Sequence, residues 1–93
     1  MDVRGTARPA GSHHVVVYGT GWCPDVRRSR ALLDSLGVPY RYVDVEEDEQ
    51  AAELVRGLQG GRRRIPTVVR SDGEHLVEPT DPDLQAWLDV GTA

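Results

Sequence analysis

Short apolar runs alternate with segments of helical period along most of the chain. A continuous apolar run, such as Val15-Val16-Val17-Tyr18, is typical of a strand buried on both faces of a sheet. Apolar residues spaced three and four positions apart indicate a helix with one buried face. These patterns predict strands over residues 15–18, 40–45, 65–70 and 74–77, and helices over 24–36, 48–59 and from 81 onward.

Proline and glycine mark the predicted boundaries. The first apolar run is predicted to break at Gly19. Pro24 fits the first position of a helix, where its missing N–H removes no hydrogen bond, and Gly37 suits the cap after that helix. Asp81, before Pro82, is predicted to be the capping acid of the last helix. The buried faces of the three helices are predicted to comprise Val26, Leu32, Leu33 and Leu36; Ala51, Leu54, Val55 and Leu58; and Leu84, Trp87 and Leu88.

The predicted element order is β-α-β-α-β-β-α. A strand, a helix and a strand within about thirty residues form a βαβ unit, so the first two strands should be parallel. The Ser71-Asp72-Gly73 turn predicts an antiparallel hairpin between the last two strands. We therefore expect one α/β domain over residues 14–93, preceded by a mobile tail over residues 1–13.

Composition and charge exclude several classes of protein. The chain has 15 acidic and 11 basic residues, a formal charge of −4, which argues against a nucleic-acid partner. No stretch has the length of a membrane span, and the single cysteine cannot form a disulfide scaffold, so a cytoplasmic protein is expected. His13 and His14 would point to opposite faces of a strand and have no partner nearby, so no metal site is expected.

The chemistry of the chain centres on Cys23, in the segment GTGWCPDVRRSR. Its sulfur should lie at the N-terminus of a helix, where the unpaired N–H groups favour a thiolate. Arg27 and Arg28 add positive charge one turn on, whereas Asp25 opposes the thiolate. A thiolate without an internal partner can attack a disulfide and wait for an outside thiol to resolve the product. Its natural substrate is therefore a mixed disulfide with a small thiol.

Three motifs carry a resemblance to a known family. They are Trp22-Cys23-Pro24 after a buried strand, Arg64-Ile65-Pro66-Thr67-Val68, and Glu78-Pro79-Thr80-Asp81 before the last helix. With the element order, they resemble the glutaredoxin family of the thioredoxin fold, especially its mycoredoxin-like members, over residues 15–90. The resemblance implies a four-stranded mixed sheet flanked by three helices. It also implies a thiol–disulfide oxidoreductase with glutathione or mycothiol as co-substrate.

The resemblance also implies roles for individual residues. Cys23 would be the nucleophile, and Pro66 would be a cis-proline facing it. The backbone of Ile65 would pair with the bound thiol, and Thr80 and Asp81 would contact the polar end of that thiol. The complete predicted thiol-binding set is Thr20, Trp22, Pro24, Arg27, Arg64, Ile65, Pro66, Thr80 and Asp81, with no metal ligand.

The chain departs from the family pattern around the cysteine. Thr20 stands where the family usually has lysine, Asp25 where it has an aromatic residue, and Val26 where it has a second cysteine. Arg64 replaces the usual threonine before the Ile65–Pro66 pair, and the basic run 62–64 is either a source of positive charge beside the site or a solvated loop.

Two other functions remain open at this level. The first is a carrier of an iron–sulfur cluster, for which one cysteine per chain makes a dimer compulsory. The second is a degenerate domain kept for binding a partner. For the favoured enzyme we expect protein mixed disulfides as partners, neither nucleic acid nor membrane, a monomer when reduced, and a disulfide-linked dimer through Cys23 on oxidation.

Overall fold

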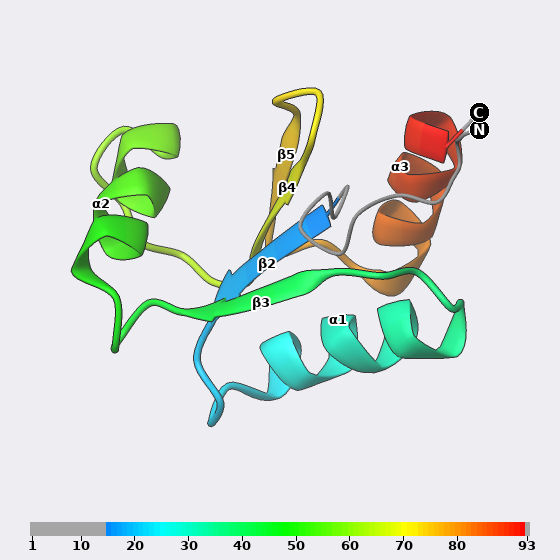
Figure 1. The fold of residues 1–93 in the computed structure, drawn as a ribbon, viewed down its shortest axis with the longest axis horizontal. Coiled ribbons are helices and arrows are strands. Elements are labelled where there is room, and N and C mark those ends of the chain that lie inside the picture. The colour runs from blue at the N-terminus through cyan, green and yellow to red at the C-terminus, as the bar shows by residue number, and fades with distance from the viewer. Residues whose placement is uncertain (1–14, 93) are drawn as a thin grey trace, which may run out of the picture.

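The computed structural model describes residues 15–92 and has the predicted order of elements (Figure 1). The predicted tail, with His13 and His14, lies outside the described residues. The elements are β2 (Val15–Gly19), α1 (Pro24–Ser35), β3 (Arg41–Asp44), α2 (Glu49–Leu58), β4 (Thr67–Arg70), β5 (His75–Val77) and α3 (Asp81–Thr92).

The four strands form one mixed sheet in the order β3-β2-β4-β5. Strands β2 and β3 are parallel, as the βαβ unit requires, and Tyr18 lies opposite Val43. Strand β4 runs antiparallel to both β2 and β5. The hairpin between β4 and β5 turns at Gly73, whose φ of 93° favours glycine. The fold is the thioredoxin-like fold that the element order and motifs predict.

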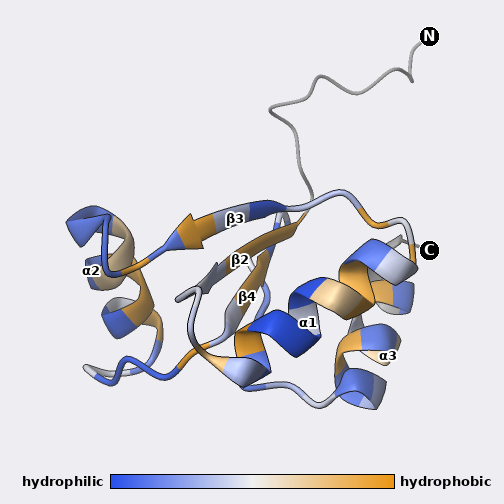
Figure 2. Ribbon diagram, turned by 90° about the horizontal axis from the view of Figure 1, so that it is seen from below, coloured by the Kyte–Doolittle hydropathy of each residue, from blue (hydrophilic) through white to orange (hydrophobic). Residues whose placement is uncertain are grey.

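Helices cover both faces of the sheet, with α1 and α3 on one face and α2 on the other (Figure 2). This arrangement explains why β2 is apolar along its whole length. Among the described residues, none of the helices has the length and apolar character needed to cross a membrane. The α1/α3 face buries Val15, Val17, Leu33, Val68, Leu84 and Leu88, and the α2 face buries Val45, Ala51, Ala52 and Val55.

The buried faces of α1 and α2 differ from the predicted ones. Leu36 is 41% exposed because α1 ends at Ser35 and Leu36 is the residue that caps it. Leu54 is 45% exposed because α2 packs on the sheet through a face of small residues centred nearer Ala52. The fully or nearly buried residues of these helices are Val26, Ser29 and Leu33 in α1, and Ala51, Ala52 and Val55 in α2.

Several strand boundaries also differ from prediction by one or two residues, and those of β2 and β4 have clear causes. Gly19 was predicted to break the first strand, yet it is the buried last residue of β2 and pairs with Asp44. A Cβ atom at Gly19 would lie 2.6 Å from Cγ2 of Val26, so glycine is needed where α1 crosses the end of β2. Strand β4 begins at Thr67 rather than two residues earlier, because Pro66 has no N–H for a ladder.

Candidate active site around Cys23

Cys23 stands at the N-terminus of α1, at the end of the turn that leaves β2. Its backbone is extended, with φ −79° and ψ 122°, and Pro24 is the first helical residue. The carbonyl of Cys23 accepts a hydrogen bond from the N–H of Arg27 at 3.1 Å, which starts the helix. Cys23 lies at the N-terminal end of the helix, which carries the positive end of the helix dipole. The residue is also partly exposed to solvent.

Val26 occupies the position where dithiol relatives would have a second cysteine. Its side chain is fully buried beneath the turn and packs against Gly19. Cys23 is the only cysteine of the chain. The apolar contact at Val26 therefore replaces an internal thiol partner.

The loop before β4 lies at the same end of the two central strands as the turn that carries Cys23. The Ile65–Pro66 peptide bond is cis, as predicted. In the antiparallel register of β2 and β4, Tyr18 lies opposite Thr67, so the next pair along would be Gly19 and Pro66. Pro66 is therefore across from Gly19, the last residue of β2 before the turn that leads to Cys23.

Gln59 fastens this loop to the end of α2 and was not predicted to matter. Its amide oxygen accepts from the N–H of Arg64 at 3.0 Å, and its Nε2 donates to the carbonyl of Arg64 at 3.0 Å. The same Nε2 donates to the hydroxyl of buried Thr67 at 2.7 Å. These three bonds fix the backbone on which a bound thiol would pair, at Ile65. A lone glutamine outside any motif gives no sequence signal for this role.

The segment before α3 is attached to the same loop. The N–H of Glu78 donates to the carbonyl of Pro66 at 2.8 Å. Glu78 has a φ of 51°, a left-handed conformation that is unusual for a residue with a side chain. The predicted cap at Asp81 is wrong: the hydroxyl of Thr80 accepts from the N–H of Asp83 at 3.2 Å and caps α3. Asp81 is instead the first helical residue.

Arg28 connects this segment to the helix that carries Cys23. Its Nη1 lies 2.9 Å from Oδ1 of Asp25, and its Nε lies 3.4 Å from Oδ1 of Asp81. Its Nη2 donates to the carbonyl of Pro79 at 3.5 Å. Asp25, which was expected to oppose the thiolate, is thus paired with a cation one turn along α1. The i,i+3 spacing of Asp25 and Arg28 was visible in the sequence, but the partner in α3 was not.

Two exposed side chains flank the turn itself. Trp22 is 63% exposed, and its Nε1 donates to Oε1 of Glu46 at 3.2 Å. Arg27 is exposed and its Nε donates to the carbonyl of Gly21 at 2.9 Å, so it holds the turn closed. The indole ring beside Cys23 offers an apolar surface to whatever approaches the sulfur.

The predicted thiol-binding residues differ in how much surface they offer. Thr20 is 1% exposed, and its hydroxyl has no hydrogen-bond partner among the described residues. Its side chain therefore lies beneath the surface, where lysine in the family pattern would reach solvent. Arg64 is exposed and lies 3.8 Å from the carboxylate of Glu78, a distance typical of a weak ion pair. Pro24, Arg64 and Thr80 are exposed, Ile65 and Asp81 are partly exposed, and Pro66 is buried.

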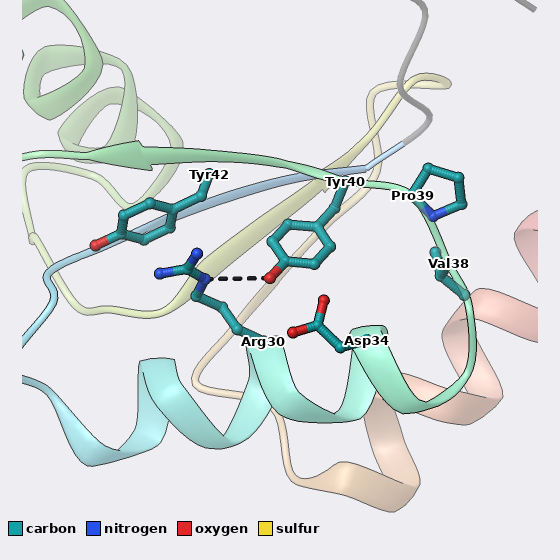
Figure 3. A pocket seen from close by; sticks show the side chains of 6 residues that line it. All are labelled: Arg30, Asp34, Val38, Pro39, Tyr40 and Tyr42. Atoms are coloured by element: carbon teal, nitrogen blue, oxygen red, sulfur yellow. Dashed lines mark hydrogen bonds between the residues drawn. The ribbon is translucent and has the colours of Figure 1, made fainter. Parts of the chain in front are cut away.

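A separate pocket of about 360 Å³ lies between α1 and β3 and contains none of the predicted site residues (Figure 3). Arg30 crosses it, with its guanidinium 3.9 Å from the ring centre of Tyr42 and its Nε donating to the hydroxyl of Tyr40 at 3.2 Å. Burial, with a smaller contribution from Asp44, raises the pKa of Tyr42 above its ordinary value of 10.0. The pocket is lined by Arg30, Asp34, Val38, Pro39, Tyr40 and Tyr42.

Known proteins with similar sequences and structures share this arrangement of elements. A family model described as Glutaredoxin matches residues 15–76. Mycoredoxin 1 of Corynebacterium glutamicum is 38% identical over 77 residues, covering 83% of this chain and 95% of that protein. The glutaredoxin of Archaeoglobus fulgidus has a TM-score of 0.72 at 24% identity, covering 91% of this chain and 98% of that one. The glutaredoxin of Methanosarcina mazei has a TM-score of 0.67 at 28% identity, covering 81% of this chain and 77% of that one.

Proposed function

Because this chain belongs to the glutaredoxin family of thiol–disulfide oxidoreductases, we propose that it removes a small thiol from protein mixed disulfides, with Cys23 as the only sulfur in its catalytic cycle. The observation that carries this proposal is the single thiol at the N-terminus of α1, with Val26 buried at the position where a second cysteine would be. We place the reaction in the cytoplasm, where thiols are kept reduced.

The proposed cycle has two exchange steps. The thiolate of Cys23 attacks the small-thiol sulfur of the mixed disulfide, the disulfide bond breaks, and the protein thiolate leaves and takes up a proton. Cys23 then holds the small thiol as a mixed disulfide of its own. A second molecule of small thiol, as its thiolate, attacks the small-thiol sulfur of that adduct and releases Cys23. Each turnover consumes one free molecule of small thiol, which leaves joined by a disulfide bond to the small-thiol moiety that came from the substrate.

The residues around Cys23 fit this cycle. Cys23 lies at the positive end of α1, and Arg27 holds the turn in place through Gly21. We propose that the backbone of Ile65 pairs with the cysteine moiety of the bound thiol. Thr80 and Asp81, which lie on the segment bonded to Pro66, would contact its polar end.

We propose mycothiol rather than glutathione as the small thiol. The support is the 38% identity to a protein named Mycoredoxin 1 over 95% of its length. The chain also lacks a lysine at position 20, so no side-chain cation from that position reaches a glutathione carboxylate. We further propose that the reduced protein is a monomer and that air oxidation joins two copies through Cys23.

The proposal is tested with two peptide mixed disulfides, one carrying glutathione and one carrying mycothiol. Peptide release and the mass of the protein are followed together. Catalytic release with a transient thiol adduct on Cys23 is expected, faster with mycothiol. Cys23→Ser is the control and should release no peptide. Turnover by Cys23→Ser, or no release by folded and reduced wild-type protein, would refute the proposal.

A further inference from the structure

All three nitrogens of the Arg28 guanidinium face oxygen atoms beside the predicted thiol-binding residues Thr80 and Asp81. Two of the three partners are carboxylates: Asp25 at 2.9 Å, from the same helix, and Asp81 at 3.4 Å, from the start of α3. The third is the carbonyl of Pro79 at 3.5 Å. About half of each charged side chain is exposed, at 46% for Arg28, 48% for Asp25 and 43% for Asp81. A ligand at this edge therefore meets a cation that already has two anionic partners.

The next arginine along this edge is also paired. Arg64 lies 3.8 Å from the carboxylate of Glu78, on the segment that continues into Asp81. The ion pairs at this edge therefore comprise three carboxylates and two arginines, an excess of one negative charge among the paired groups. Oδ1 of Asp81 is buried and makes no hydrogen bond among the described residues; its contact with Nε of Arg28 at 3.4 Å is an ion pair alone, and the exposed part of this carboxylate is the edge that carries its other oxygen. That edge can accept a hydrogen bond from a ligand.

Two classes of small thiol would experience this edge differently. Glutathione carries two carboxylates and one ammonium group, and its carboxylates would have to compete with Asp25 for Arg28. A thiol whose polar part is a sugar or polyol carries hydroxyl and amide groups, which donate hydrogen bonds to carboxylates without a charge conflict. The local charge therefore favours the uncharged class.

We propose that Arg28 is a specificity-determining residue, and that its bridge between Asp25 and Asp81 selects a thiol with an uncharged, hydroxyl-bearing polar part. This inference rests on the proposed function of Cys23. Arg28 acts in two ways: it holds the start of α3 against α1, and it is withheld from ligand carboxylates because Asp25 occupies it. The departure at Asp25, where the family pattern has an aromatic residue, is the origin of the selection.

In the test, the full wild-type chain and four variants are each assayed with a glutathione mixed disulfide and a mycothiol mixed disulfide. The readouts are kcat/KM for peptide release and the fraction of Cys23 that forms an adduct with each small-thiol disulfide, measured by mass. The variants are Asp25→Asn, Arg28→Gln, Arg28→Lys and Asp34→Asn. Asp34→Asn makes the same charge change on the same helix, in the pocket between α1 and β3 that contains none of the predicted thiol-binding residues, and is the matched control. The decisive quantity is the ratio of kcat/KM for the two substrates, because a loss of fold lowers both kcat/KM values together.

Asp25→Asn should free Arg28 and raise kcat/KM for the glutathione mixed disulfide about fivefold. This is the upper end of what an exposed charge pair contributes. The kcat/KM for the mycothiol mixed disulfide should stay within about twofold of the wild-type value. Arg28→Gln should leave the carboxylates without a neutralising cation. It should lower kcat/KM for the glutathione mixed disulfide about fivefold relative to kcat/KM for the mycothiol one. Arg28→Lys should return the ratio toward that of the wild type. These differences should shrink with added salt, because the charges are exposed, and Asp34→Asn should leave the ratio unchanged.

Two results would overturn the inference, and they are distinguishable. If release still requires Cys23 but neither Asp25→Asn nor Arg28→Gln changes the ratio, Arg28 is only a structural tie and the proposed function stands. An equal loss with both substrates leads to the same conclusion. If the folded wild-type protein forms no Cys23 adduct with either thiol, the proposed function and the inference both fail.

Discussion

Gly19→Ala should destabilise the fold and displace the redox turn through one contact. Gly19 ends β2 directly under the first turn of α1. An added Cβ would lie 2.6 Å from Cγ2 and 2.8 Å from Cγ1 of Val26, whereas nonbonded carbon atoms pack best about 3.5–4.0 Å apart. The φ of Gly19 is not in the left-handed region, so alanine meets no backbone strain there. The effect of the substitution is therefore steric.

The size of the effect follows from overpacking. Forcing an extra carbon into a well-packed site costs about 1–3 kcal/mol. In a domain of this size each kcal/mol lowers Tm by about 4–8 °C. Relief requires α1 to move away from the sheet at Val26, and Cys23 lies at the end of that helix. We therefore expect at least about a tenfold loss of peptide release, since a small misplacement of reacting groups has effects of this order or larger.

A double-mutant cycle isolates this contact. Val26→Ala removes both colliding methyl groups and alone should cost about 2 kcal/mol through lost burial and a cavity. In the double variant the new Cβ would face only Cβ of Val26, at 3.2 Å. The combined loss should therefore fall short of the sum of the single losses by about 1–2 kcal/mol. Urea unfolding followed by circular dichroism measures each free energy, provided that the m-value is constant.

Two other glycines provide matched controls. Gly21 lies in the same turn, and Gly57 lies within α2; a Cβ on either would have nothing within 4 Å, and neither has a positive φ. Gly21→Ala should therefore leave stability and activity nearly unchanged, and Gly57→Ala should stabilise by about 0.5–1 kcal/mol. The reasoning is refuted if the losses at Gly19 and Val26 are additive, or if Gly21→Ala is as harmful as Gly19→Ala.

Three further substitutions test other features. Val26→Cys should allow an internal disulfide with Cys23, seen by mass as the loss of two hydrogens; a persistent small-thiol adduct after oxidation would contradict this. Tyr42→Phe removes a buried hydroxyl without a partner among the described residues and should stabilise the protein by up to about 1 kcal/mol. Because burial raises the pKa of Tyr42 above 10.0, the wild type should lose stability as the pH rises above 10 through that pKa, and the variant should lose less, as alkaline unfolding curves will show. Glu78→Gly should raise the free energy of unfolding by up to about 1 kcal/mol by relieving the φ of 51°, whereas Glu78→Gln should not.

The sequence predicted the fold well because the apolar period is strong where the sheet is covered on both sides. The run from Val15 predicted a doubly covered strand, and Ser71-Asp72-Gly73 predicted the hairpin. The errors concern which residues of a helix face inward. Alanine fits either environment, so the sequence could not show that α2 packs through Ala52 instead of Leu54. Polar Ser29 was likewise not expected to be buried.

The place of Cys23 at the start of α1 was predicted, but the contacts that support the surrounding loops were not. The place of Cys23 follows from proline at the start of a helix, a local signal. The bridge from Arg28 to Asp81 and the bonds from Gln59 to Arg64 depend on how separate segments meet in the fold. Such contacts have no local sequence pattern, because either side chain would be equally acceptable on a solvated surface.

The apolar contact at Val26 also decides what an oxidant does to this protein. Peroxide converts a thiolate to a sulfenic acid, which a neighbouring thiol normally captures before further, irreversible oxidation. Cys23 has no such neighbour in its own chain. A thiol from outside the chain, either a small thiol or Cys23 of a second copy, can capture it with loss of water, and capture by a small thiol gives the same mixed disulfide as the proposed turnover. If the proposed function holds, the small-thiol pool both reduces this protein and protects it against permanent oxidation.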